Sequence, residues 1–167
     1  MTLPRGTDRR GRKDPMDRDL LAVATLLAWT EQGLPKHAMM RRAVSTAYYA
    51  LFHALADRCA KTLVTSSGSD WDTFTLVYRA LDHASAKRFF EMRDVERFGA
   101  EIASLARVFV NLQQARITAD YLPTRFPYGQ KQVIEFVEQA REGCEVIAKI
   151  STGNMRRLAA QIIFKRR

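Results

Sequence analysis

Residues 42–59 read RAVSTAYYALFHALADRC, and this stretch decides the fold. Its apolar residues recur at the three- and four-residue intervals of a helix with a buried face. Within that pattern a row of polar residues recurs every four positions, at Ser45, Tyr49, His53 and Asp57. That spacing places the row on one side of the helix. The row is either the solvated face of a core helix or the lining of a site.

The same periodicity predicts further helices along the chain and no convincing strand. The expected long helices cover residues 17–32, 36–65, 99–121 and 129–152. A further helix, capped by Ser69, carries Trp71 to Leu81, and a short one covers 86–93. Such a pattern is typical of an all-α protein. We expect an antiparallel bundle of four to five helices, with the helices at 36–65 and 99–121 as its long inner members.

The positive charge of the chain lies mostly at its two ends. The net charge is +9, yet residues 17–153, the expected helical domain, hold 17 basic and 16 acidic residues. The ends, 1–16 and 154–167, are expected to be basic tails, the first of them disordered. They either add salt-sensitive affinity for RNA, DNA or anionic lipid, or simply solvate the ends. The second end either forms a short amphipathic helix or is ragged, and Met16 is a plausible alternative start.

Several classes of protein do not fit this sequence. A length of 167 residues suggests one domain. No run of 18 apolar residues is present, so we expect no membrane span, and residues 1–16 lack the apolar stretch of a signal peptide. Cys59 and Cys144 form no metal-binding motif, which indicates reduced thiols in a cytoplasmic protein. We expect neither a metal nor a cofactor, since HExxH and Gly-rich phosphate loops are absent.

Ser45, His53 and Asp57 invite interpretation as a catalytic triad. Residues eight apart on a helix are separated by about 12 Å of rise. That separation exceeds the hydrogen-bond distance that a nucleophile and its base require. A hydrolase built from these three residues on one helix is therefore not expected.

A second group of candidate residues stands near the end of the helix at 99–121. The stretch QQARITADYLPTR offers Arg116, Asp120 and Tyr121 close together. Arg116 and Asp120 are four apart, so a plain surface ion pair is one interpretation. The alternative is that the three side chains converge on an adjacent groove, because the helix end is followed by a proline linker.

Taken together, RRAVSTAYYALFHAL at 41–55 and RITADY at 116–121 resemble the HEPN family (higher eukaryotes and prokaryotes nucleotide-binding). The resemblance covers residues 17–152. It implies an all-α bundle that is usually a homodimer. Many members are RNA-cleaving toxins or defence nucleases that work without a metal, through an arginine and a histidine contributed by each subunit. Other members lack this motif and serve as binding or scaffolding modules, often beside a nucleotidyltransferase.

The chain departs from the nuclease motif of the family. Arg116 fits the arginine, but no histidine follows it, and Asp120 and Tyr121 stand where the family places its histidine. Asp titrates near 3.9 and Tyr near 10, so neither suits proton transfer at neutral pH as histidine does. His53 is a candidate substitute if its helix neighbours Arg116, with Tyr49 as a further hydroxyl donor. The alternative is that both face a dimer partner or bond within the bundle.

One more histidine imitates a shortened nuclease motif. His83 follows Arg79 by four residues, but it lies in the wrong element for that motif.

The leading prediction is a homodimeric HEPN-like module that binds RNA, a nucleotide or a protein partner. Its expected ligand site consists of Ser45, Tyr49, His53 and Arg116. The resemblance links such a module to toxin–antitoxin or defence systems. One alternative is a metal-independent RNA endonuclease in which Arg116 acts with His53, Asp120 or Tyr121. Another is a scaffold for a nucleotidyltransferase or antitoxin.

Overall fold

A computed structural model describes residues 16–29, 36–64 and 71–164. This part of the chain is helical and contains no strand, which confirms the predicted all-α bundle. The helices are α1 (Met16–Ala28), α2 (His37–Leu63), α3 (Trp71–Ala80), α4 (His83–Phe90), the 3₁₀ turn η1 (Val95–Phe98), α5 (Ala100–Tyr121), α6 (Gln130–Lys149) and α7 (Thr152–Ile163). Ser69, the predicted cap, and the N-terminal tail up to residue 15 lie outside the described residues.

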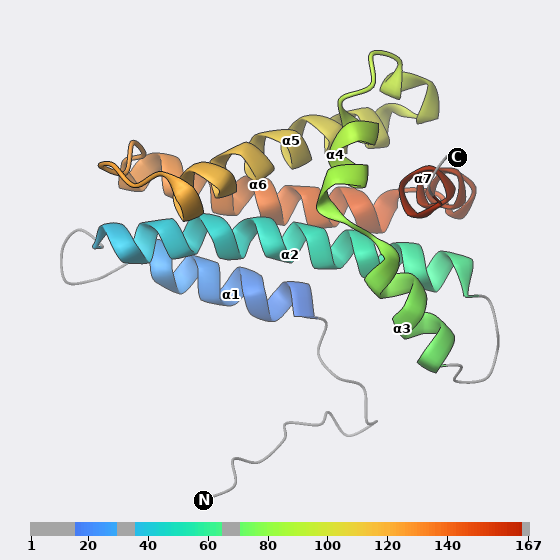
Figure 1. The fold of residues 1–167 in the computed structure, drawn as a ribbon, viewed down its shortest axis with the longest axis horizontal. Coiled ribbons are helices and arrows are strands. Elements are labelled where there is room, and N and C mark those ends of the chain that lie inside the picture. The colour runs from blue at the N-terminus through green and yellow to red at the C-terminus, as the bar shows by residue number, and fades with distance from the viewer. Residues whose placement is uncertain (1–15, 30–35, 65–70, 165–167) are drawn as a thin grey trace, which may run out of the picture.

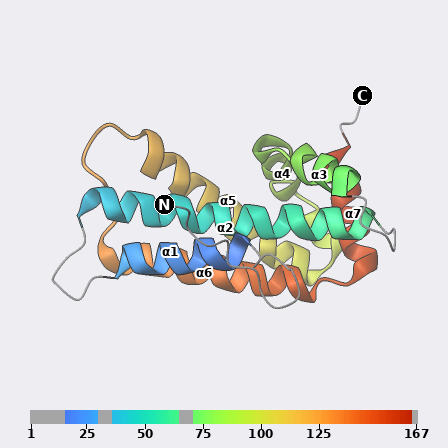
Figure 2. The same ribbon diagram turned by 90° about the horizontal axis from the view of Figure 1, so that it is seen from below.

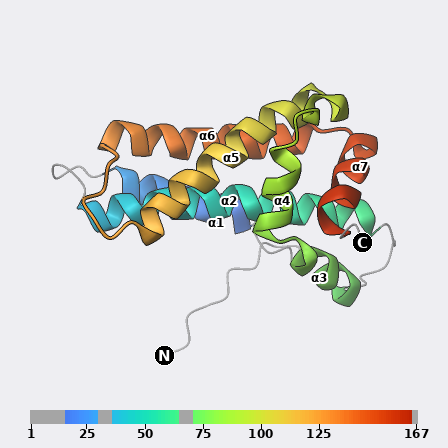
Figure 3. The ribbon, with the colours of Figure 1, turned by 45° about the horizontal axis from the view of Figure 1, so that its top comes forward.

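The helix α2 lies at the centre of the bundle (Figure 1). It contacts α1, α3, α5, α6 and α7. The helices α1 and α5 run antiparallel to α2 and α6, so these four form the body of the bundle. Figure 2 shows α3 and α4 across α2 from α6, and Figure 3 shows α7 crossing the bundle near the C-terminal end of α2.

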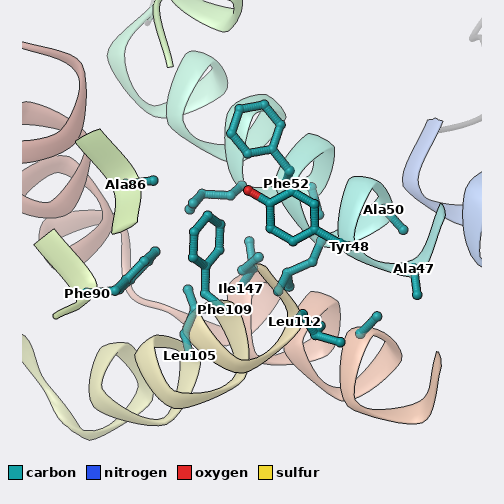
Figure 4. Close-up of a cluster of buried hydrophobic side chains, with 14 of the residues drawn as sticks. Ala47, Tyr48, Ala50, Phe52, Ala86, Phe90, Leu105, Phe109, Leu112 and Ile147 are labelled. Atoms are coloured by element: carbon teal, nitrogen blue, oxygen red, sulfur yellow. The ribbon is translucent and has the colours of Figure 1, made fainter. Parts of the chain in front are cut away.

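The composition of α2 explains its central place. Alanines at 43, 47, 50, 54, 56 and 60 are buried, so neighbouring helices approach α2 closely on several sides. Between them, Tyr48, Leu51 and Leu55 are fully buried. The ring of Tyr48 lies 5.6 Å from that of Phe109 on α5, in the cluster drawn in Figure 4. Because its buried residues surround the helix rather than follow one stripe, α2 is a core helix.

Residues 152–163 form a packed helix and not a tail. We expected residues 154–167 to lie outside the domain, as a short helix or a ragged end, but α7 begins at Thr152 and is part of the core. The Oγ of Ser151 accepts a hydrogen bond from the backbone N–H of Asn154, which caps the helix. Four of its residues are buried: Met155, Leu158, Ala159 and Ile162. The boundary that we predicted at residue 153 therefore falls inside a packed helix.

Two smaller differences concern α3 and α4. The side chain of Trp71, counted among the apolar residues of the third helix, is 64% exposed, and α3 has no buried residue. The short helix predicted at 86–93 begins earlier, at His83, because the carboxylate of Asp82 accepts a hydrogen bond from the N–H of Ser85. This cap determines where His83 lies.

Candidate functional site

The C-terminal end of α5 meets the middle of α2 through a set of polar side chains. Arg116 donates from Nη2 to the hydroxyl of Tyr49 at 2.8 Å, and its Nε lies 2.8 Å from Oδ2 of Asp120. The hydroxyl of Ser45 donates to the same Oδ2 at 3.3 Å. We refer to Ser45, Tyr49, Arg116 and Asp120 as the Arg116 site. Two residues of the α2 row are thus brought together with two residues of RITADY.

This arrangement is more than a surface ion pair. The side chains of Arg116 and Asp120 are only 17% and 24% exposed. The guanidinium of Arg116 also lies over two rings, 5.4 Å from the centroid of Tyr49 and 5.4 Å from that of Tyr121. Burial lowers the pKa of Arg116, but the bond to Tyr49 and the nearby Asp120 and Tyr121 outweigh it and raise the pKa. The guanidinium is therefore a permanent, partly shielded positive charge.

A second arginine holds the end of α5 in place. Arg41 donates from Nη1 to the carbonyl of Ala119 at 2.8 Å and from Nη2 to the carbonyl of Thr124 at 2.8 Å. The last carbonyls of a helix have no partner within the helix, and a cation is favourable there. Arg41 stands four residues before Ser45. It therefore extends the polar row of α2 and fixes the position of Asp120 relative to α2.

His53 lies beside the Arg116 site, and its hydrogen bond leads away from it. Its Nδ1 is hydrogen-bonded to the hydroxyl of Tyr78 on α3, and the two rings are stacked with centroids 5.9 Å apart. The ring of Tyr49 is 6.3 Å from that of His53. Burial is the main cause that lowers the pKa of His53, while Asp17 acts in the opposite direction. His53 therefore joins α2 to α3 next to the site.

Asp57 does not lie on the same face of α2 as Ser45 and Tyr49. It forms an ion pair with Lys61 at 2.6 Å. Steps of four residues drift by about 40° each on a helix with 3.6 residues per turn. Three steps from Ser45 therefore turn Asp57 about a third of the way around α2. This drift agrees with the expectation that Ser45, His53 and Asp57 do not form a triad.

His83, which we expected to lie in the wrong element for the nuclease motif, packs against Tyr49 of the Arg116 site. Its Nδ1 lies 2.7 Å from the hydroxyl of Tyr48, and its ring is 4.0 Å from that of Phe52 and 5.9 Å from that of Tyr49. Burial lowers its pKa most, and the charge of Arg116 lowers it further. Arg79, whose spacing drew attention to His83, is exposed. The cap at Asp82 was the signal that could have placed this histidine at the start of a helix.

Among the described residues, no group of three or more His, Cys, Asp or Glu side chains is placed to hold a metal ion. Within the same residues, no helix is long and apolar enough to cross a membrane. Comparisons of the chain with protein-family models, curated proteins and solved structures gave no match. The chemistry of the Arg116 site is therefore the basis for a function.

Proposed function

We propose that this protein is a HEPN-like homodimeric module that binds single-stranded RNA at the Arg116 site. One observation carries the proposal: the row on α2 and the RITADY motif on α5, which carry the resemblance, meet in one cluster around Arg116. A partly shielded arginine is well suited to hold a phosphate group.

The donors of Arg116 leave room for a ligand. A guanidinium has five N–H donors. Nη2 donates to Tyr49, while Nε forms an ion pair with Asp120 without the geometry of a hydrogen bond. The remaining N–H groups are suited to phosphate oxygens. The ring of Tyr121, 68% exposed at the edge of the site, provides a face on which a base stacks.

Asp120 acts against tight binding. Its carboxylate is acceptor-only when ionised and repels a phosphate that approaches Arg116. It also neutralises part of the charge that would attract the strand. We therefore expect binding of moderate affinity that weakens steeply with added salt.

The test is RNA binding by the purified full-length chain, measured as the anisotropy of a labelled single-stranded oligonucleotide. Arg116→Ala should weaken binding at least tenfold. Arg107→Ala is the matched control, because Arg107 is an exposed arginine on the same helix. Both variants need a melting curve to show that they are folded. Equal binding by the wild type and a folded Arg116→Ala variant would rule out this site.

A metal-independent RNA endonuclease is the second candidate, and His83 is the observation that favours it. The neutral form of His83 is favoured, and its ring is 5.9 Å from that of Tyr49, which contacts Arg116. In this reaction His83 accepts the proton of a ribose 2′-hydroxyl, and the 2′-oxygen bonds to phosphorus. The bond to the 5′-oxygen breaks, that oxygen takes a proton from water, and Arg116 stabilises the charged phosphorane.

Cleavage in EDTA distinguishes the two candidates. A nuclease would release products ending in a 2′,3′-cyclic phosphate, and His83→Gln and Arg116→Ala would each abolish them. Arg107→Ala, a change at an exposed arginine of α5, serves as the control. Binding without cleavage would support the binding module and contradict the nuclease.

The homodimer and any protein partner are inferred from the family resemblance. Light scattering behind size exclusion measures the mass of the particle, and a mass of one chain at micromolar concentration would contradict the dimer. The proposed nucleotidyltransferase or antitoxin partner is tested by co-purification with the product of a neighbouring gene.

A further inference from the structure

A cavity of about 410 Å³ lies at the end of the bundle where α2 and α6 begin. His37 and Met40 line it from α2, and Arg125, Phe126 and Tyr128 line it from the linker between α5 and α6. Sites for small molecules have volumes of roughly 300–1,000 Å³. The cavity is therefore large enough for a planar ring with a polar group attached.

The lining is aromatic and held in place. The ring of Phe126 is buried, lies 5.3 Å from that of Tyr128 and 6.5 Å from that of His37, and has the guanidinium of Arg41 5.1 Å from its centroid. Tyr128 in turn packs 5.0 Å from Phe136 of α6. The exposed ring of His37 and the half-buried ring of Tyr128 are the surfaces suited to stack on a base. The rings around the cavity are fixed before a ligand arrives, which reduces the entropic cost of binding.

Arg125 lines the cavity, and its lining residues include no Asp or Glu. Residues 36–56 contain Lys36, Arg41 and Arg42 and no Asp or Glu, and residues 121–134 contain Arg125 and Lys131 and again no Asp or Glu. This contrasts with the near balance of basic and acidic residues over 17–153 as a whole. Such a concentration of positive charge favours a ligand that carries phosphate.

The cavity and the Arg116 site both use residues of α2. His37, Arg41 and Ser45 are spaced four residues apart, so His37 and Ser45 are about 12 Å apart along the helix axis. Arg41 connects them, since it contacts both Phe126 and the carbonyl of Ala119, the residue before Asp120. A short oligonucleotide spans this distance.

We propose that this cavity is a second subsite, which takes the base of a nucleotide and places its phosphate against Arg125. The inference rests on the proposed function, because the two sites would bind neighbouring parts of one RNA strand. A free nucleoside monophosphate carries the same chemistry, and the experiment separates it from RNA.

The experiment titrates the full-length protein with a labelled hexauridylate, with uridine monophosphate and with inorganic phosphate. Arg125→Glu is the test variant, since Arg125 is exposed and its replacement leaves the core intact. It should weaken hexauridylate binding at least tenfold. A second variant, Arg125→Ala, should weaken it about fivefold and reduce the slope of log affinity against log salt by about one. Arg107→Ala should bind as the wild type does.

The outcomes separate the two proposals. If Arg125→Glu binds hexauridylate like the wild type while Arg116→Ala does not, the cavity is no subsite and the proposed function stands. If the wild type binds uridine monophosphate but not hexauridylate, and Arg125→Glu loses that binding, the cavity takes free nucleotides and the RNA function fails. If the wild type binds phosphate as tightly as uridine monophosphate, the base makes no contact and the subsite is overturned. Binding of none of the three ligands overturns both proposals.

Discussion

The carboxylate of Asp120 lies 2.8 Å from Nε of Arg116, and the pair is mostly buried against α2. This contact holds the arginine in position and at the same time competes with any phosphate that approaches it. Asp120 thus has two effects of opposite sign on a phosphate ligand. The relative size of these effects can be measured.

Replacing Asp120 by Asn should increase RNA affinity. The change removes a negative charge beside Arg116 and keeps an oxygen that can accept from Ser45. We expect roughly a tenfold gain, equivalent to about 1.4 kcal/mol. Asp19→Asn changes the net charge equally at an exposed position of α1 and is the control. A loss of affinity in Asp120→Asn would mean that positioning of Arg116 outweighs repulsion.

Stability should fall on mild acidification because of two histidines. Burial is the largest cause that lowers the folded pKa of both His53 and His83. The unfolded chain therefore takes up protons first, near the ordinary histidine value of about 6.5. Stability is complete above that pH and is lost as the pH falls toward the lowered folded values.

Melting temperatures at pH 7.5 and pH 5.5 test this expectation. The double variant His53→Gln, His83→Gln should show a smaller decrease between the two values than the wild type. His37→Gln, at an exposed position, should keep the wild-type decrease. If the melting temperature of the double variant decreases as much as that of the wild type, other groups cause the pH dependence.

The crossing of α2 and α6 depends on a glycine. A Cβ on Gly143 would stand 2.6 Å from Cδ1 of Leu51, which is fully buried. We expect Gly143→Ala to cost about 1–3 kcal/mol of unfolding free energy, because a packed core resists overfilling. Gly153 in α7 has no atom within 4 Å of such a Cβ. Gly153→Ala should instead stabilise the protein by about 0.4–1 kcal/mol, measured by urea denaturation.

The helix α7 should contribute to the stability of the whole domain. Leu158 is fully buried, and Leu158→Ala should cost about 2–5 kcal/mol. Arg156 is exposed on the same helix, and Arg156→Ala should change stability by no more than about 0.5 kcal/mol. Chemical denaturation of both variants measures the difference. Equally small stability changes in Leu158→Ala and Arg156→Ala would indicate that α7 unfolds independently of the bundle.

Much of the fold could be read from local patterns. The apolar period of residues 42–59 correctly predicted a core helix, and observed helix ends after residue 71 mostly lie within three residues of the expected ones. A contact of Tyr49 with Arg116 was one of two alternatives, because both belong to motifs expected on neighbouring long helices. The helices themselves follow from repeats within each segment.

The sequence by itself determined the helices, their apolar faces and the row of polar residues on α2. Only the tertiary structure decided that His53 bonds to Tyr78, that His83 bonds to Tyr48 and that α7 packs into the core. The physical reason is that a helical period fixes the direction of a side chain relative to its own axis. Which residue of another helix lies opposite depends on how the helices pack, and that is decided by contacts between residues distant in sequence.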